Sequence, residues 1–274
     1  MEKPTLYLVP TPIGNLKDIT LRALDVLGAV DLIVCEDTRE TRKLINYFNI
    51  KRPLISYERF SESKKLERIL EQLQSGKNVA IVSDAGTPAI SDPGAKLITK
   101  ARERGIRVEA LPGPSALITA LSASGFEAPF RFIGFFPRKK DMIERELLRM
   151  SISTDVTIFY ESPRRLLGTL RSITKHVQGR PICVAREISK IHEEYLVGPV
   201  HEVISRIEGR VLKGEVTVLV KGSENFNTLD EGTLKDLARA LLQSGYSKKD
   251  VLHILSGETG IGRNEIYRML IHLD

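Results

Sequence analysis

One loop places the strongest constraint on how this chain can fold. It reads VSDAGTPAISDPG and covers residues 82–94. It follows an apolar run at 79–82 that is typical of a buried strand, and a helix is expected to begin near Gly94. Loops at the carboxyl ends of parallel strands are where open α/β sheets bind ligands. A simpler interpretation is a helix-capping loop, with Asp92 as the cap and Pro93 as the first helical residue.

Two further loops of this kind follow other apolar runs. The run at 6–9 continues into PTPIGN (10–15), and the strand expected at 107–111 ends in PGPSA (112–116). None of the three contains the glycine patterns that bind dinucleotides or triphosphates. Three Pro/Gly loops after three strands would suit a flat, weakly charged ligand held by backbone groups.

Strand and helix patterns predict an α/β fold with two domains. In the first domain, strands alternate with helical patterns at 16–29, 40–48, 62–75 and 94–104, and the strands are expected at 5–10, 31–35, 79–84 and 107–111. Near-continuous apolar strands between amphipathic helices indicate a largely parallel sheet that is covered on both faces.

The second domain has strand candidates that partly follow one another without intervening helices, which indicates a mixed sheet. These candidates lie at 130–136, 155–161, 181–187, 193–197 and 215–221. A helix starting near Pro114 links the two domains. We expect domain limits of 1–113 and 114–224, followed by a helical tail at 228–274.

The tail is predicted to form three short helices, at 234–242, 248–255 and 263–270, with a glycine stop and a serine cap at 245–247. This spacing resembles a helix-turn-helix. Residues 228–274, however, hold six Lys/Arg and seven Asp/Glu. Because a unit that binds DNA should be basic, docking or oligomer packing is an equally open role for the tail.

Composition is typical of a cytoplasmic globular enzyme, with 42% hydrophobic and 28% charged residues. No apolar run approaches the roughly 18 residues of a membrane span, and the N-terminus lacks the apolar core of a signal peptide. Cys35 and Cys183 lie in strand-like runs without metal-ligand spacing. We therefore expect buried, reduced thiols and no metal site.

The net charge of +6 favours a polyanionic partner. Residues 162–185 contain five Lys/Arg and no acidic residue, and residues 96–107 contain five Lys/Arg against Glu103. Such runs are most often solvated helix faces. At the mouth of a loop-lined cleft, they would suit phosphate contacts that position RNA without reading its sequence.

Six motifs together carry a resemblance to a known family. In chain order they are VPTPIGNLKDIT, CEDTR, SDAGTPAISDPG, LPGPSA, FYESPRR and REISKIHEE. With them the chain resembles the tetrapyrrole-methylase superfamily of S-adenosylmethionine-dependent methyltransferases, in the branch called ribosomal RNA small subunit methyltransferase I. The resemblance implies S-adenosylmethionine in a cleft between the two domains, a homodimer, and 16S ribosomal RNA or the small ribosomal subunit as substrate. It also implies that the methyl acceptor is the ribose 2′-hydroxyl of a cytidine in the decoding region.

The resemblance also implies the cofactor contacts. They are Pro12, Ala85, Gly86, Thr87, Ile90, Ser115, Ala116, Glu161 and Ile188. Many superfamily members have Gly-Gly-Asp where this chain has Ala85-Gly86-Thr87, so a side-chain contact from a carboxylate is in doubt there, whereas backbone contacts are still expected. Glu161 departs from the apolar residue that is common at its position.

Methyl transfer depends mainly on alignment, because a sulfonium methyl group is already activated. A ribose hydroxyl is a poor nucleophile, so a base or an electrostatic aid would help. The best cluster is REISKIHEE, 186–194, where Lys190 would act as a base or hold a phosphate. The charged neighbours in this interpretation are Arg186, Glu187 and Glu193. The alternative is a strand-to-strand loop with a surface ion-pair network.

Asp37 in CEDTR is a second catalytic candidate, and the alternative is that Asp37 or Thr38 caps the helix at 40–48. The candidate RNA contacts are Arg39, Arg164, Arg165 and Arg171. Two other functions stay open. One is methylation of a tetrapyrrole, whose many carboxylates would also suit basic patches. The other is regulation by nucleic-acid binding without catalysis.

Overall fold

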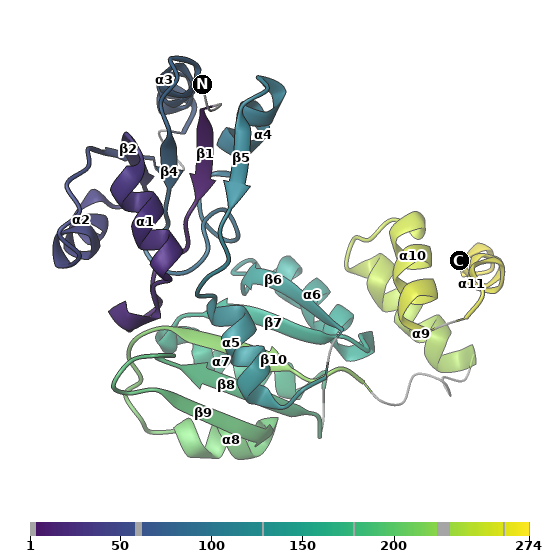
Figure 1. Cartoon of the computed structure of the whole chain (residues 1–274). Helices are drawn as coiled ribbons and strands as arrows, with labels where there is room; N and C mark the ends of the chain where they lie inside the picture. Colours follow the sequence, from purple (N-terminus) through teal and green to yellow (C-terminus); the bar gives the residue numbers. More distant parts are fainter. Residues whose placement is uncertain are drawn as a thin grey trace. The chain divides into compact units, whose positions relative to one another are not determined.

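The computed structural model describes residues 4–57, 62–127, 129–177, 179–223, 231–259 and 261–273. The chain divides into two compact units (Figure 1). Unit 1 comprises residues 1–119 with 188–191, and unit 2 comprises residues 120–187 with 192–274. The division falls within α5 (Ala116–Ser124), six residues after the expected limit at 113. The expected limits at 224 and 228 lie outside the described residues.

Unit 1 contains a five-stranded sheet with the order β3-β2-β4-β1-β5. Its strands are β1 (Thr5–Leu8), β2 (Leu32–Cys35), β3 (Leu54–Ser56), β4 (Val79–Ile81) and β5 (Arg107–Ala110). All of their pairings are parallel, which confirms the predicted parallel sheet. The short β3 is an addition to the expected strands.

Helices cover both faces of this sheet, as the near-continuous apolar strands between amphipathic helices predict. The helices are α1 (Leu21–Ala29), α2 (Thr38–Tyr47), α3 (Glu62–Gln74) and α4 (Ala95–Glu103), with the short 3-10 helix η1 (Leu16–Asp18) before α1. Leu73 of α3 and Leu97 of α4 pack with Val34 on one face. Leu27 of α1 and Ile45 of α2 pack with Ile33 on the other face.

The helix after the loop at 82–94 begins two residues later than it would if Asp92 were its cap and Pro93 its first residue. The helix α4 begins at Ala95, and Gly94 occupies its N-cap position with φ +138° and no side-chain cap. This left-handed glycine turns the chain before the helix starts, so Asp92 and Pro93 lie outside it. The interpretation of Asp92 as the cap is therefore wrong, whereas the predicted helix start near Gly94 is confirmed.

Unit 2 contains a mixed sheet with the order β6-β7-β10-β8-β9. Its strands are β6 (Phe130–Phe135), β7 (Val156–Glu161), β8 (Pro181–Arg186), β9 (Glu194–Pro199) and β10 (Val216–Val220). The β6–β7 pair is parallel, and the other pairs are antiparallel. This confirms the mixed sheet. The structure adds helices that the sequence analysis did not name: α6 (Lys140–Ile152), α7 (Pro163–Thr174) and α8 (Val200–Ile207).

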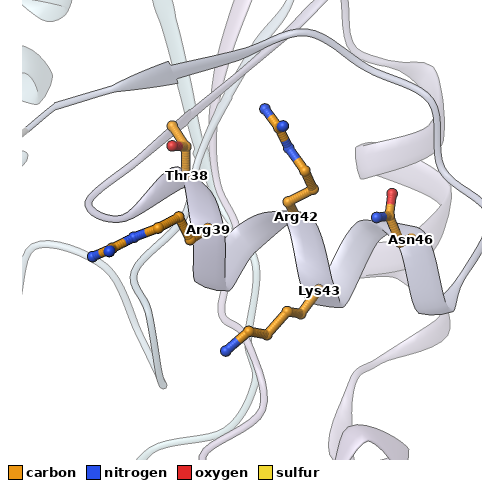
Figure 2. A pocket seen from close by; sticks show the side chains of 5 residues that line it. All are labelled: Thr38, Arg39, Arg42, Lys43 and Asn46. Atoms are coloured by element: carbon orange, nitrogen blue, oxygen red, sulfur yellow. The ribbon is translucent and has the colours of Figure 1, made fainter.

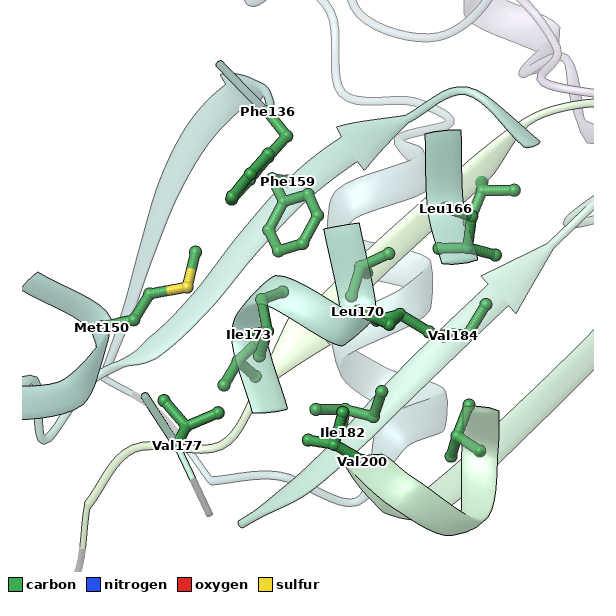
Figure 3. Packing of buried hydrophobic residues seen from close by; sticks show 14 of the residues in the cluster. Phe136, Met150, Phe159, Leu166, Leu170, Ile173, Val177, Ile182, Val184 and Val200 are labelled. Carbon is green, nitrogen blue, oxygen red and sulfur yellow. The ribbon is translucent and has the colours of Figure 1, made fainter. Parts of the chain in front are cut away.

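The core of unit 2 lies between its sheet and the helices α7 and α8 (Figure 3). Leu170 and Ile173 of α7 pack with Val184 of β8, and the rings of Phe136 and Phe159 lie 4.8 Å apart. The thiol of Cys183 is buried in the sheet, and its burial raises the pKa to about 11. Cys35 is likewise buried and free, as expected.

The tail forms the three predicted helices, α9 (Glu231–Gln243), α10 (Lys248–Thr259) and α11 (Arg263–Ile271). Ser247 caps α10, because its hydroxyl accepts the Asp250 N–H at 3.1 Å while the Asp250 carboxylate accepts the Ser247 N–H at 3.1 Å. The tail core includes Ile152 of α6. Arg145 of α6 also donates to the Ser244 carbonyl. Across the described part of the chain, each helix is too short or too polar to span a bilayer.

Glycine at 113 is required by close packing between two loops of unit 1. A Cβ at Gly113 would lie 2.7 Å from Pro10 Cβ, and a proline ring cannot move aside. We expect Gly113→Ala to lower the free energy of unfolding by about 1–3 kcal/mol in denaturant titrations. As the matched control, Gly28→Ala on α1 meets no atom within 4 Å and should raise stability by up to about 1 kcal/mol. Equal stability of Gly113→Ala and the wild type would contradict this packing.

Candidate active site

The first two Pro/Gly loops are joined by backbone hydrogen bonds. Thr11 N–H donates to the Gly86 carbonyl at 2.9 Å, and Gly86 N–H donates to the Thr11 carbonyl at 3.0 Å. The Thr11 hydroxyl donates to the Ser83 carbonyl at 3.0 Å, and the Ser83 hydroxyl donates to the Gly86 carbonyl at 2.9 Å. All of these groups are buried, so the two loops form one rigid structure.

The third loop meets the other two at Gly86. The Thr87 hydroxyl donates to the Pro114 carbonyl at 3.1 Å. A Cβ at Gly86 would lie 3.4 Å from Ile13 Cγ2 and 3.7 Å from the Pro114 oxygen. Gly86 itself has φ +82°, a conformation that favours glycine. The loops after β1, β4 and β5 therefore meet at one point, at the carboxyl ends of their strands.

A fourth segment, Ile188–Ile191, also belongs to unit 1. It packs against Gly14, where a Cβ would lie 2.9 Å from the Ile188 carbonyl oxygen. The Ser189 hydroxyl donates to the Asp18 carboxylate. Ser189 has φ +66°, and Glu187, two residues earlier, has φ +51°. Left-handed backbone at two residues other than glycine is strained, and such strain is concentrated at functional sites.

The expected cofactor residues fit S-adenosylmethionine. All except Glu161 belong to unit 1. They are neutral, they offer backbone groups, and Ile90 presents an apolar side chain that is 54% exposed. A neutral surface of this kind suits the uncharged adenine and ribose of the cofactor.

Glu161 lies in unit 2, and its carboxylate is buried at the start of α7. One oxygen accepts the Ser162 N–H at 2.7 Å, and the other accepts the Thr169 hydroxyl at 2.7 Å. The Arg165 guanidinium lies 3.3 Å away. The carboxylate therefore holds α7 in place within unit 2, and a contact with the cofactor stays a prediction.

The catalytic candidates belong to both units. Lys190 and Asp37 belong to unit 1, whereas Arg186, Glu187 and Glu193 belong to unit 2. Arg186 forms an ion pair with Glu194 at 3.2 Å, and Glu194 also pairs with Arg210 at 2.8 Å. The Glu187 carboxylate accepts the Glu215 N–H at 3.0 Å. These contacts favour the ion-pair alternative for Arg186. The Glu187 carboxylate bonds to backbone, and catalytic roles for Glu187 and the exposed Glu193 stay predictions.

Asp37 caps α2, as the alternative interpretation predicts. Its carboxylate accepts the Arg39 N–H at 2.7 Å and pairs with the Arg39 guanidinium at 2.7 Å. These hydrogen bonds lower the Asp37 pKa to about 2. The Asp37 N–H donates in turn to Asp84 Oδ1 at 3.0 Å. Desolvation raises the pKa of Asp84, and the nearby carboxylates of Asp37 and Glu40 add to this effect.

The candidate RNA contacts differ in their surroundings. Arg164 is exposed. Arg165 donates to the Pro137 carbonyl at 2.6 Å and pairs with Glu161, so its guanidinium is used within unit 2. Arg171 pairs with Glu208 at the surface.

Arg39 lines a pocket along α2 that the sequence motifs did not reveal (Figure 2). The side chains that line it are Thr38, Arg39, Arg42, Lys43 and Asn46 of α2. The sequence pattern could have indicated this surface, because the spacing of three and four residues places these side chains on one face of the predicted helix.

Comparison with known proteins assigns the family. The family model of Tetrapyrrole (Corrin/Porphyrin) Methylases matches residues 5–204. A Bacillus subtilis (strain 168) protein named ribosomal RNA small subunit methyltransferase I is 40% identical over 96% of this chain and 92% of its own length. A Thermotoga maritima protein of the same name is 48% identical over 80% of this chain and 99% of its own length. The chain belongs to this family of methylases. It is an S-adenosylmethionine-dependent methyltransferase.

Solved structures share the fold. Diphthine synthase has a TM-score of 0.61 at 13% identity and covers 97% of this chain and 99% of its own. Uroporphyrin-III C-methyl transferase from Thermus thermophilus, complexed with S-adenyl homocysteine, has a TM-score of 0.56 at 15% identity and covers 78% of this chain and 96% of its own. The methyltransferase therefore has a two-unit α/β architecture that other methylases also adopt.

A bulky side chain at Gly86 should block the cofactor surface of this methyltransferase. We expect Gly86→Phe to weaken S-adenosylmethionine binding by roughly ten-fold or more in calorimetry. Because Gly86 has a left-handed backbone, the substitution also adds strain. Gly76→Phe is the matched control, with φ +94° and nothing within 4 Å of its Cβ, in the turn that precedes β4. Equal cofactor affinity in the two variants would show that Gly86 does not line the cofactor site.

The cap of α2 should be sensitive to acid. Because the pKa of Asp37 is lowered to about 2, its contribution to stability is complete above about pH 4 and is lost as the pH falls through about 2. Asp37→Asn keeps the cap but does not titrate. We expect the stability advantage of the wild type over Asp37→Asn, measured by thermal unfolding, to shrink between pH 4 and 2. A constant difference across this range would contradict the ion pair.

Proposed function

We propose that this methyltransferase transfers a methyl group to small-subunit (16S) ribosomal RNA, at the ribose 2′-hydroxyl of a cytidine in the decoding region. The observation that supports RNA as the substrate is the 40% identity, over 96% of the chain, to a protein named ribosomal RNA small subunit methyltransferase I. The choice of the ribose, the cytidine and the decoding region rests on the family resemblance. The proposal also includes a homodimer and a cytoplasmic location.

When bound, S-adenosylmethionine supplies a methyl group that its sulfonium already activates. The hydrogen-bonded loops around Gly86 would hold the cofactor through backbone groups and exclude water. Since these loops are rigid before binding, they align the reacting groups at little entropic cost. The protein then has to assist the loss of one proton from the 2′-hydroxyl.

Lys190 is the residue we propose for this step. It lies in Ile188–Ile191, which is fixed against Gly14 and by the Ser189–Asp18 hydrogen bond. A neutral Lys190 would accept the hydroxyl proton. A charged Lys190 would instead hold a phosphate or stabilise the developing alkoxide.

A test of the substrate uses labelled S-adenosylmethionine with unmodified small ribosomal subunits and, separately, with uroporphyrinogen. We expect label on the RNA only, and mass spectrometry should place it on a cytidine ribose. Transfer to uroporphyrinogen alone would establish the tetrapyrrole alternative. Label on a base would overturn the proposed acceptor but not the RNA substrate.

Two variants of Lys190 distinguish a proton acceptor from an electrostatic contact. A positioned acceptor contributes about 10²–10⁴-fold, so Lys190→Ala should lower the single-turnover methylation rate by that factor with near-normal cofactor affinity. Lys190→Arg keeps the charge but cannot accept a proton at neutral pH, so it should be equally slow. Full activity of Lys190→Arg would instead show an electrostatic role. Normal methylation rates and normal RNA affinity in both variants would show that Ile188–Ile191 has no catalytic role.

A further inference from the structure

A pocket of about 320 Å³ lies along α2, and the reaction described above does not use it. Figure 2 shows the side chains that line it, and every charged one is cationic: Arg39, Arg42 and Lys43, with Thr38 and Asn46 beside them. The opposite face of the helix, with Leu44 and Ile45, is buried against the sheet.

The cations of this pocket are available to a ligand. Arg39 pairs with Asp37 and Lys43 pairs with Glu40, each at 2.7 Å. The Arg39 side chain is 85% exposed and that of Lys43 is 71% exposed. Exposed pairs of this kind are weak, so a stronger anion can replace the carboxylates. Arg42 takes part in none of the ion pairs found among the described residues.

The chemistry of the pocket fits a phosphodiester. A guanidinium presents a planar fork of donors that matches phosphate oxygens, and an ammonium adds a point charge. The Thr38 hydroxyl and the Asn46 amide are neutral donors at the two ends of the pocket.

The pocket lies next to the cofactor loop, and both belong to unit 1. The link between them is the hydrogen bond of 3.0 Å from Asp37 N–H to Asp84 Oδ1. Asp37 is the residue before α2, and Asp84 is the residue before Ala85 and Gly86. A phosphate in the pocket would therefore belong to a nucleotide close to the one that is methylated.

We propose that this pocket binds a backbone phosphate of the RNA substrate beside the methylated nucleotide, with Arg42 as its principal contact. This inference rests on the proposed function. A phosphate contact positions RNA without reading its sequence, so the pocket would set which nucleotide along the strand reaches the cofactor.

The test compares two pocket variants with one control. Arg42→Ala removes the principal cation, and Asn46→Asp adds a negative charge with little change of shape. Arg68→Ala on α3 is the control, because Arg68 is also exposed, makes no ion pair among the described residues and lies outside both basic runs. RNA binding is measured with unmodified small-subunit ribosomal RNA transcribed in vitro, over a series of salt concentrations. Cofactor affinity is measured by calorimetry.

Both pocket variants should weaken RNA binding several-fold and leave cofactor affinity unchanged. Arg42→Ala should also reduce the slope of log affinity against log salt by about 0.7–0.9, the value of one phosphate contact. The control should change neither property. Should Arg42→Ala fail to fold, Asn46→Asp decides the question.

Unchanged RNA affinity and salt slope in the folded pocket variants would overturn the proposal, while methylation by the wild type would still support the function. Loss of cofactor affinity with normal RNA binding would also overturn it and assign the pocket to the cofactor. If the wild type neither binds this RNA nor methylates unmodified small ribosomal subunits, the proposed function fails, and the pocket proposal fails with it.

Discussion

The pair of backbone hydrogen bonds between Thr11 and Gly86 is the contact on which the candidate site depends. It forms because β1 and β4 are neighbours in a parallel sheet, so the loops after them leave the same edge. Gly86 supplies the left-handed turn that brings the second loop back toward the first. The Thr87–Pro114 bond then adds the third loop. The surface proposed for the cofactor is thus built from backbone that the sheet has already fixed.

Neutral and charged groups are divided between neighbouring parts of unit 1. The expected cofactor residues around Gly86 are uncharged, and α2 carries the cations of its pocket. Asp37 connects these parts, because it caps α2, pairs with Arg39 and donates its N–H to Asp84. A methyltransferase with a polyanionic substrate would need this division, since the cofactor ribose and adenine are uncharged and a nucleic-acid backbone is not.

The segment Ile188–Ile191 belongs to unit 1, although it is far along the chain from the rest of that unit. Its flanking strands, β8 and β9, belong to the sheet of unit 2, yet the segment itself belongs to unit 1. The absence of a side chain at Gly14 leaves room for it, and Ser189 ties it to Asp18. The left-handed residues Glu187 and Ser189 allow the chain to enter and leave this position. Strain at these residues is therefore a consequence of placing Lys190.

The sequence by itself determined the features that depend on neighbouring residues: the apolar strands, the amphipathic helices, the Pro/Gly loops and the caps at Asp37 and Ser247. Only the tertiary structure decided which distant groups meet. Thr11 and Gly86, which exchange two backbone hydrogen bonds, lie in loops that follow different strands. The strand order β3-β2-β4-β1-β5 and the joining of Ile188 to Gly14 have the same origin. Caps and periodicity are set by contacts within a few residues, whereas these arrangements depend on packing between segments that the sequence does not bring together.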